Sequence, residues 1–378
     1  MTGRVILFGA TGFTGRLTAE VMTRAGMAPV LAGRSPEALV ALTGDLAGLG
    51  PIDAPPTWQD ADVTDPESVR ALVHGPDDVL VTTVGPFAEL GRVAIDAAID
   101  AGCSYVDSTG ESTFIRQVFE QDAPRAAESG ARLLTAFGYD YVPGNLAGGL
   151  AIRDARNAGR IPTVVKVGYF VRGGMALSSG TRASAAGMIT AKPFSLRNGH
   201  VVETRGSVRT FDVAGRRLDA MPIGASEHFA LPRLDPGVRD VTVGLGWAGR
   251  WTKSAHAMGS AVGAAAQVPG LGTLLSRATR AATGTATGEG PDTATRAKAR
   301  TVVAARCLDG VGREVSRVTV EGPSPYDLTA ELLAWGAAML LTGHASAPGA
   351  LGPADAFGLD ALELGCADLG LARLPSGS

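Results

Sequence analysis

The stretch RVILFGATGFTG, residues 4–15, decides the fold of this chain. After Arg4, the four residues VILF (5–8) form an apolar run typical of a buried strand, and glycines follow at positions 9, 12 and 15. A strand that passes through a glycine turn into a helix brings the backbone close to a dinucleotide pyrophosphate, and the helix N-terminus attracts its negative charge. We expect dinucleotide contacts from Gly9, Thr11, Gly12, Phe13, Thr14 and Gly15.

Glycine is abundant throughout the chain, with 51 glycines among 378 residues, so a glycine-rich turn without a ligand is the alternative. The spacing GxxGxxG also differs from the common GxGxxG pattern. The glycines show no every-third-residue period, which excludes collagen, and an apolar fraction of 45% excludes general disorder. The turn therefore stands out through its context, a strand before it and a helix after it.

Charge and cysteine content exclude several further classes. The net charge is −3 and the sequence pI is about 6.0, so no general attraction to nucleic acid is expected. The three cysteines (Cys103, Cys307 and Cys366) and five histidines are scattered, which predicts neither a disulfide framework nor a metal site. No signal-peptide pattern precedes the first strand, and no apolar run reaches the ~20 residues of a membrane span. We expect a cytoplasmic protein without an integral span, with peripheral lipid contact left open.

Residues 1–145 alternate between strand and helix patterns, which predicts a Rossmann-type, doubly wound parallel sheet that binds NADP(H). The expected strands are 4–8, 29–32, 56–61, 79–84, 105–107 and 131–136. The expected helices include 15–25, 66–72, 91–101 and 111–129.

Residues 146–325 have a different pattern and predict a second α+β domain on a mixed, largely antiparallel sheet. Helices are expected at 146–158 and 179–189. Strands are expected at 164–171, 200–205, 209–212, around Ala230, and at 238–245, 300–308 and 314–321, the last two joined by a glycine turn. Residues 278–295 predict a mobile loop. A C-terminal helical segment, 326–378 with a helix at 328–341, is expected to pack back on the core.

The end of the second expected strand indicates which dinucleotide is bound. An acid there would hold the ribose 2′-hydroxyl of NAD, but this strand ends in Arg34-Ser35, and no acid lies at that position. A guanidinium can pair with a 2′-phosphate through its planar fork, which favours NADP(H). The alternative is that Arg34 is a solvated loop residue. Further cofactor contacts are expected from loops after later strands: Asp62 and Val63, then Gly85, Pro86 and Phe87, and Gly110.

The loop after the sixth expected strand carries the candidate catalytic residues Tyr139, Asp140 and Tyr141. Either phenol could donate a proton to a substrate that receives hydride. The alternative is that Tyr139 packs between domains while Asp140 caps a turn. Asp107 and Glu111, after the fifth strand, could orient substrate or cap the following helix. No tyrosine has a lysine four residues later, which argues against an ordinary short-chain ketone reductase.

Taken together, these segments resemble the saccharopine dehydrogenase-like oxidoreductases, within the bacterial branch that includes trans-acting enoyl reductases. The matching pieces are GATGFTG (9–15), AGRS (32–35), TVGPF (83–87), YVDSTGE (105–111), GYD (138–140), SGT (179–181), Gly290-Pro291 before Arg296, and PYDLTA (325–330).

The resemblance implies a Rossmann-type domain, a second domain with substrate and dimer surfaces, hence a homodimer, a nicotinamide cofactor, and reduction of a C=C or C=N bond. Where the family commonly has Gly-Phe-Asp-Ser-x-Pro-x-Asp, this chain has Tyr139, Tyr141 and Asn145. These departures lie beside the expected reaction site and suggest a specialised substrate.

The leading hypothesis is an NADPH-dependent reductase. It would transfer hydride to an activated C=C bond of a small or carrier-bound enoyl thioester, polyketide or lipid-like intermediate, or to a C=N bond. One alternative is a saccharopine-like amino acid (imine) dehydrogenase, in which Arg172 and Arg182 could hold substrate carboxylates. Another is a non-catalytic protein that keeps the nucleotide as a structural ligand and binds lipid or protein through Trp247–Leu275.

Overall fold

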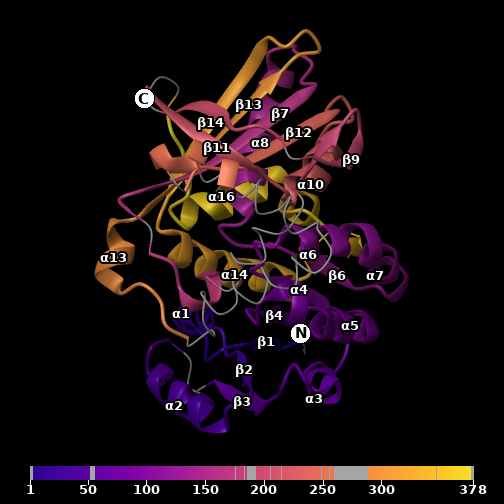
Figure 1. Ribbon diagram of the computed structural model, residues 1–378. Helices are drawn as coiled ribbons and strands as arrows, with labels where there is room; N and C mark the ends of the chain where they lie inside the picture. The colour runs from indigo at the N-terminus through magenta and orange to yellow at the C-terminus, as the bar shows by residue number, and fades with distance from the viewer. Residues whose placement is uncertain are drawn as a thin grey trace, which may run out of the picture.

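The computed structural model describes residues 3–51, 56–174, 176–182, 184, 193–204, 206–213, 215–247, 249–254, 256–258, 288–345 and 347–375. The described elements build two sheets with helices around and between them (Figure 1). The N-terminal sheet lies at the bottom of that view and the second sheet at the top.

The N-terminal sheet has seven strands, all parallel, in the order β15-β6-β5-β4-β1-β2-β3. The six predicted strands are all present, and their order is that of a dinucleotide-binding sheet, so the Rossmann-type prediction is confirmed. The order of the strands reverses between β1 and β4, which opens a crevice at their carboxyl ends. The strands are β1 (Val5–Phe8), β2 (Val30–Gly33), β3 (Thr57–Asp60), β4 (Val79–Thr82), β5 (Ser104–Asp107), β6 (Arg132–Leu134) and β15 (Gly349–Ala350).

Two helices of the N-terminal part begin at residues whose side chains cap the first turn. Ser35 caps α2 by accepting a 3.4 Å hydrogen bond from the Ala38 amide, and Asp65 caps α3. The single helix expected over 111–129 is divided by a π-helical turn (Val118–Asp122), because Pro124 has no amide to continue the hydrogen-bond ladder. The helices are α1 (Phe13–Arg24), α2 (Pro36–Leu46), α3 (Pro66–Arg70), α4 (Phe87–Leu90), α5 (Arg92–Ala101), α6 (Ser112–Gln117) and α7 (Ala123–Ser129).

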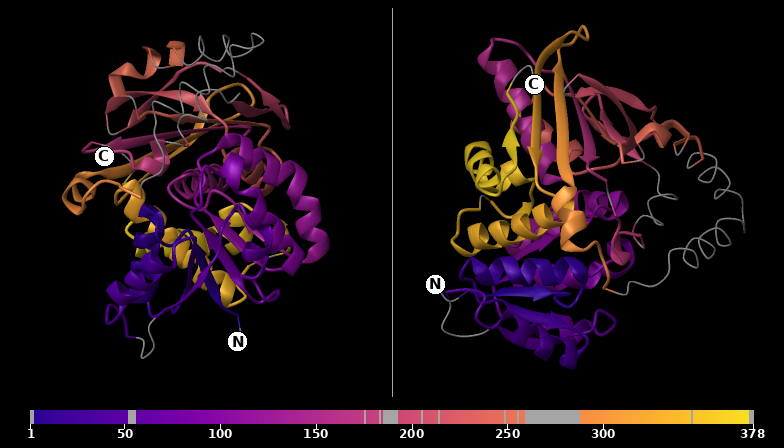
Figure 2. Two further views of the ribbon diagram at one scale, coloured as in Figure 1. Left: turned by 60° about the horizontal axis from the view of Figure 1, so that its bottom comes forward. Right: turned by 90° about the vertical axis from the view of Figure 1, so that its left-hand side faces the viewer.

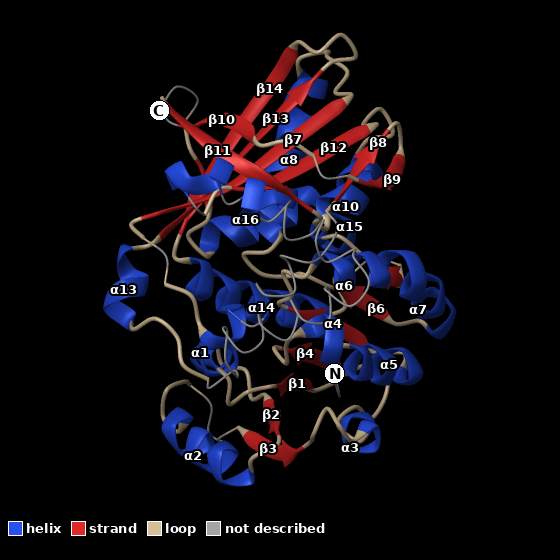
Figure 3. Cartoon of the chain, viewed as in Figure 1, coloured by secondary structure: helices blue, strands red, loops and turns tan. Residues whose placement is uncertain are grey.

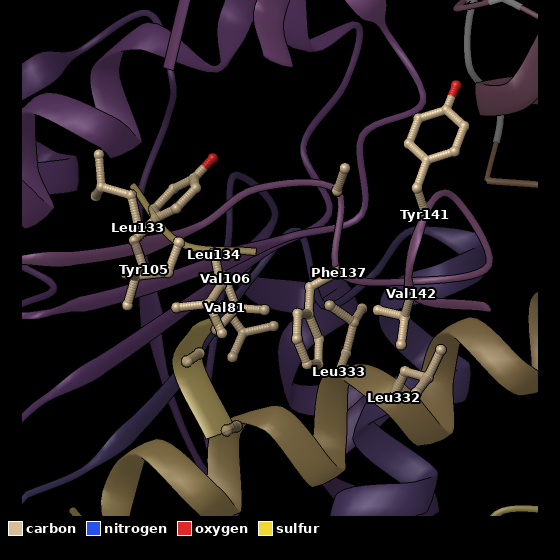
Figure 4. Close-up of a cluster of buried hydrophobic side chains, with 14 of the residues drawn as sticks. Val81, Tyr105, Val106, Leu133, Leu134, Phe137, Tyr141, Val142, Leu332 and Leu333 are labelled. Atoms are coloured by element: carbon tan, nitrogen blue, oxygen red, sulfur yellow. The ribbon is translucent and has the colours of Figure 1, made fainter. Parts of the chain in front are cut away.

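Helix α14 (Pro325–Leu341) packs against α1, β4 and β5, although these three elements lie far from α14 in the sequence (Figure 2). Its buried Leu332 and Leu333 lie against Phe137 and Val142 (Figure 4). A Cβ at Gly336 would be 2.6 Å from the Phe137 ring, so glycine allows this close approach. The C-terminal segment thus completes the core on the side of the N-terminal sheet that faces the second sheet (Figure 1).

The second sheet has nine strands, and only the β12–β7 pair is parallel (Figure 3). The prediction of a mixed, largely antiparallel sheet is therefore confirmed, as is the β13–β14 hairpin. Helix α8 (Val142–Asn157), which crosses the predicted domain boundary, packs against β7, β13 and β14. The strands are β7 (Val164–Arg172), β8 (Phe194–Arg197), β9 (His200–Glu203), β10 (Arg209–Val213), β11 (Arg216–Ile223), β12 (Asp240–Leu245), β13 (Arg300–Leu308), β14 (Glu314–Gly322) and β16 (Ala372–Arg373).

One local prediction was wrong. The strand expected around Ala230 is helix α10 (Glu227–Leu234), because its buried Glu227, Ala230 and Leu231 follow helical spacing and pack towards α8. The last residues of the expected mobile loop 278–295 overlap the start of α13 (Thr293–Lys298), which is capped by a 2.7 Å hydrogen bond from the Thr295 amide to Asp292.

Most of that loop lies outside the described residues, as does most of the helix expected at 179–189, although residues 179–182 and 184 are helical. The remaining elements are a 3₁₀ turn (Gly249–Trp251), α15 (Pro353–Phe357) and α16 (Leu359–Asp368). Among the described helices, none combines the length and apolarity needed to cross a bilayer.

Candidate functional site

A cleft of about 620 Å³ opens at the carboxyl ends of the parallel strands, beside the β1–β4 switch point. One wall consists of the loops after β1 to β5, and includes Gly9, Gly33 and Ser108. The opposite wall comes from the second part of the chain, at residues 178–181 and Trp247. Loops from distant segments therefore enclose one site.

The glycine turn has the geometry needed to approach a diphosphate. Gly9 has a φ of +87°, and a Cβ there would be 2.8 Å from the Thr83 hydroxyl oxygen. A Cβ at Gly15 would overlap the Gly9 carbonyl oxygen, so this glycine lets α1 start directly against β1. Gly12 is the N-cap residue of α1, whose first turn has no acid to compete for the exposed amides. These residues fit a diphosphate.

Arg34 and Ser35 line the end of the cleft nearest β2, together with Asp62 and Val63. Arg34 makes no ion pair within the described part of the chain, so its guanidinium is available to a ligand. Hydrogen bonds from Thr64 hold the Asp62 carboxylate and lower its pKa, and the charge of Arg34 lowers it further.

Gly85, Phe87 and Gly110 also line the cleft. Gly15 and Pro86, which were predicted as cofactor contacts, are not among its lining residues. Phe87 begins α4, and the buried Glu111 carboxylate accepts hydrogen bonds of 2.8 and 3.0 Å from the Phe87 and Ala88 amides. Glu111 thus caps α4 rather than its own helix, and it holds the loop after β4 against the cleft.

Asp107 stabilises the loops without lining the cleft. It is fully buried, and its Oδ1 accepts hydrogen bonds of 2.9 and 2.8 Å from the Thr109 and Ala136 amides. Burial raises its pKa to about 6. Asp107 therefore joins the loops that follow β5 and β6.

Of the three candidate catalytic residues, Asp140 alone lines the cleft. Its carboxyl group has no hydrogen-bond partner among the described residues, and burial raises its pKa to about 7. A Cβ at Gly110 would be 3.0 Å from Asp140 Oδ2, so glycine at that position leaves room for the carboxyl group. An acid with this pKa can give or take a proton near neutral pH.

The two tyrosines beside Asp140 are only 2% exposed, and both hydroxyls are used inside the protein. The Tyr139 hydroxyl accepts a 2.9 Å hydrogen bond from the Trp247 indole, and the Tyr141 hydroxyl donates a 3.2 Å hydrogen bond to the Gly110 carbonyl. Burial raises the pKa of both phenols.

Sequence reasoning missed the pair Tyr169–Glu227, which lies behind the Asp140–Tyr141 turn. The Tyr169 hydroxyl donates a 2.6 Å hydrogen bond to Glu227 Oε1 and accepts one of 2.8 Å from the Gly144 amide. Burial first, and the charge of Asp140 in addition, raise the pKa of Glu227 to about 8. The one signal in the sequence is Gly144, where a Cβ would overlap both side chains.

Sequence reasoning also missed a hydroxyl cluster on the opposite wall. The Tyr326 hydroxyl lies 3.0 Å from Thr181 Oγ1 and accepts a 2.7 Å hydrogen bond from the Ser178 amide. The Tyr326 ring meets Phe13 of the glycine turn edge to face, with ring centroids 5.2 Å apart. The family segments at 9–15, 179–181 and 325–330 thus converge at this end of the cleft.

Within the described ranges, no group of three or more His, Cys, Asp and Glu side chains is arranged to hold a metal ion.

Comparisons with known proteins agree with this architecture. No protein-family model matches the chain. It is 38% identical over 144 residues to a trans-acting enoyl reductase of Mycobacterium tuberculosis, and 38% identical over 147 residues to that of Mycobacterium leprae. Each match covers 38% of this chain and 34% of the relative, so the similarity spans about a third of the relatives' length.

Among solved structures, the chain is similar to apo saccharopine dehydrogenase (L-Glu forming) of Saccharomyces cerevisiae, with a TM-score of 0.59 and 14% identity. That match covers 98% of this chain and 99% of the yeast chain. The resemblance predicted from the sequence is thereby confirmed: this chain has the fold of saccharopine dehydrogenase and is similar in sequence to trans-acting enoyl reductases.

Proposed function

We propose that this chain is an oxidoreductase that uses NADPH to reduce the activated C=C bond of an enoyl thioester. The observation that carries the proposal is the carboxyl group of Asp140, which has no hydrogen-bond partner among the described residues and a pKa of about 7, in the same cleft as the glycine turn. The names of the similar mycobacterial proteins and the saccharopine dehydrogenase fold support an oxidoreductase.

The residues of the cleft suggest how NADPH would be held. The amides around Gly12, at the start of α1, would bind the diphosphate, and the Arg34 guanidinium with the Ser35 hydroxyl would bind the 2′-phosphate. Gly85 and Phe87 would border the nicotinamide ribose. When bound, reduced nicotinamide supplies the hydride that forms the new C–H bond at the β-carbon.

Addition of hydride at the β-carbon leaves negative charge on the α-carbon and the thioester carbonyl, so the α-carbon must gain a proton. Asp140, neutral in a large part of the molecules at pH 7, would donate that proton and recover one from water in the open cleft. We favour Asp140 over Tyr139 and Tyr141 as the donor, because both phenol hydroxyls are buried and form hydrogen bonds with other groups of the protein.

An amino acid substrate has less support. A saccharopine-like dehydrogenase needs cations for the carboxylates of its substrate. Arg172 pairs with Glu321 at 3.3 Å, and Arg182 donates to the Leu177 carbonyl, and neither lines the cleft. Among the described residues that line it, Arg34 is the one cation, at the end assigned to the cofactor. An imine without carboxylates remains the second candidate substrate, since Asp140 could protonate its nitrogen.

The test is oxidation of NADPH, followed at 340 nm, with the crotonyl thioester of N-acetylcysteamine as substrate. We expect turnover by the wild type and loss of turnover in Asp140→Asn with NADPH binding retained. Asp45→Asn, which changes an exposed acid of α2, should behave as wild type. NADPH binding without turnover of enoyl or imine substrates would instead support a non-catalytic protein. Light scattering would test the homodimer that the family resemblance suggests.

A further inference from the structure

The outer face of the second sheet, opposite the face covered by α8, carries a row of polar side chains. The strand register sets Thr242 of β12 beside Lys166 of β7, and Lys166 beside Arg306 of β13. Laterally paired residues of a pleated sheet point to the same face, so these three side chains are neighbours. Val165 and Val167, which alternate with Lys166, are buried in the main core.

Two more arginines join this row. Arg306 lies over the Phe211 ring of β10, with its guanidinium carbon 5.4 Å from the ring centroid. Arg209, two residues before Phe211 on β10, points to the same side of that strand. Arg197, at the end of β8, lines a hollow together with Arg209 and Thr242. We call Lys166, Arg197, Arg209 and Arg306 the basic cluster.

The charges of the basic cluster are not neutralised within the described part of the chain, where none of its four side chains has an ion-pair partner. The acids nearest in the register are used elsewhere: Glu314 pairs with Arg317 at 2.9 Å, and Asp240 Oδ1 accepts a hydrogen bond from the Asn198 amide. Burial and the neighbouring arginines lower the pKa of both Lys166 and Arg209.

Two buried polar atoms in the row also have no hydrogen-bond partner: the Thr242 hydroxyl and Arg306 Nε. A buried donor without a partner costs about 1–3 kcal/mol, so such groups are usually satisfied by a ligand or water. The Thr242 hydroxyl lines a small hollow of about 20 Å³ with the hydroxyls of Ser195 and Thr204, while Arg306 lies outside its lining, two strands away. Lys166, Arg209 and Arg306 are half-buried, so the cationic groups are recessed and suit a small group more than a flat protein surface.

We propose that the basic cluster, at the mouth of this hollow, binds a small molecule through a phosphate or diphosphate group. A multiply charged anion would neutralise the repulsion among the four cations and accept hydrogen bonds from the unpartnered donors. Arginine forks match the oxygen geometry of phosphate, and three of the four cations are arginines. The site lies on a different face from the strand ends that form the cofactor cleft, so the inference does not depend on the proposed function.

The test is calorimetric titration of the full-length protein with inorganic pyrophosphate, in buffers of equal ionic strength. We expect saturable binding by the wild type and at least about tenfold weaker affinity in Arg209→Gln, the effect of losing charge-assisted hydrogen bonds. Arg300→Gln, on the same strand and face as Arg306 but six residues away, should keep the affinity within about twofold.

A second measurement separates binding from a structural role. Without anion and at low ionic strength, Arg209→Gln should melt at a higher temperature than the wild type, because one of the repelling charges is removed. Two results would overturn the proposal: no saturable binding by the wild type, or equal pyrophosphate affinity in Arg209→Gln, since the anion would then bind elsewhere, such as at the glycine turn.

Discussion

The hydroxyl of Tyr169 and the carboxyl group of Glu227, 58 residues apart in the sequence, form a 2.6 Å hydrogen bond in the interior of the protein. The same hydroxyl accepts a hydrogen bond from the Gly144 amide and lies 3.1 Å from the Tyr141 carbonyl oxygen. This pair therefore supports the turn that presents Asp140 to the cleft, and it places a second ionisable acid behind the first.

Replacing Glu227 by glutamine should stabilise the protein at high pH. The pKa of Glu227 is about 8 in the fold against an ordinary 4.5, so the folded state holds a proton that the unfolded chain releases. The wild type therefore loses stability as pH rises from 4.5 through 8, on the order of 5 kcal/mol in total. Glutamine cannot ionise, so Glu227→Gln should lack this loss in urea unfolding at pH 5 and pH 9.

The matched variant is Tyr169→Phe, which leaves both the Gly144 amide and Glu227 Oε1 without their partner. We expect it to lower the free energy of unfolding by about 1–3 kcal/mol at pH 5, where Glu227 is neutral. If Glu227→Gln and the wild type lose stability in parallel between pH 5 and pH 9, Glu227 does not carry the raised pKa.

The pH dependence of reduction should follow Asp140. Its pKa is raised to about 7, so the neutral, proton-donating form is lost as pH rises through 7, and kcat/KM for an enoyl thioester should fall there. Asp140→Asn should lower kcat by about 10²–10⁴-fold and remove the step near pH 7. The measurement is the rate of NADPH oxidation between pH 5.5 and 9. A rate that rises through pH 7 would show that Asp140 is not the proton donor.

Arg34→Gln should weaken NADPH binding by about tenfold or more, because two or more charge-assisted hydrogen bonds to the 2′-phosphate would be lost. NADH binding should change little, since NADH has no such phosphate. Fluorescence titration of both cofactors measures this, with Arg24→Gln on the surface of α1 as the control. Equal affinity of the wild type for NADH and NADPH would contradict the NADP(H) assignment.

Two glycine-to-alanine changes in neighbouring helices should have opposite effects. In Gly15→Ala the new Cβ overlaps the Gly9 carbonyl, so we expect a loss of about 1–3 kcal/mol and weaker cofactor binding. At Gly44 in α2 nothing lies within 4 Å of the new Cβ, and alanine should add about 0.5–1 kcal/mol through its helix propensity. The melting temperatures of both variants measure these effects. A higher melting temperature for Gly15→Ala would contradict the prediction, because the glycine turn would then accommodate the new Cβ.

Much of the N-terminal part could be predicted from the sequence, because its strands are short apolar runs separated by turn residues. Helix α10 could not be predicted, because its few apolar residues are equally compatible with a strand. Its helical conformation depends on packing against α8, which the local sequence does not show. Strand β15 was missed for a similar reason: two residues carry no pattern, and they become a strand by pairing with β6.

The glycine turn and Arg34 were determined by the sequence itself, because the glycines at 9, 12 and 15 directly follow an apolar strand and the second strand ends in Arg34-Ser35 instead of an acid. The tertiary structure alone decided how the loop at 139–141 is used. Three adjacent polar residues looked equivalent along the chain, but packing against Trp247 and Tyr169 buries both phenols and leaves Asp140 facing the cleft. Side-chain exposure and pKa depend on segments far apart in sequence, which local patterns do not encode.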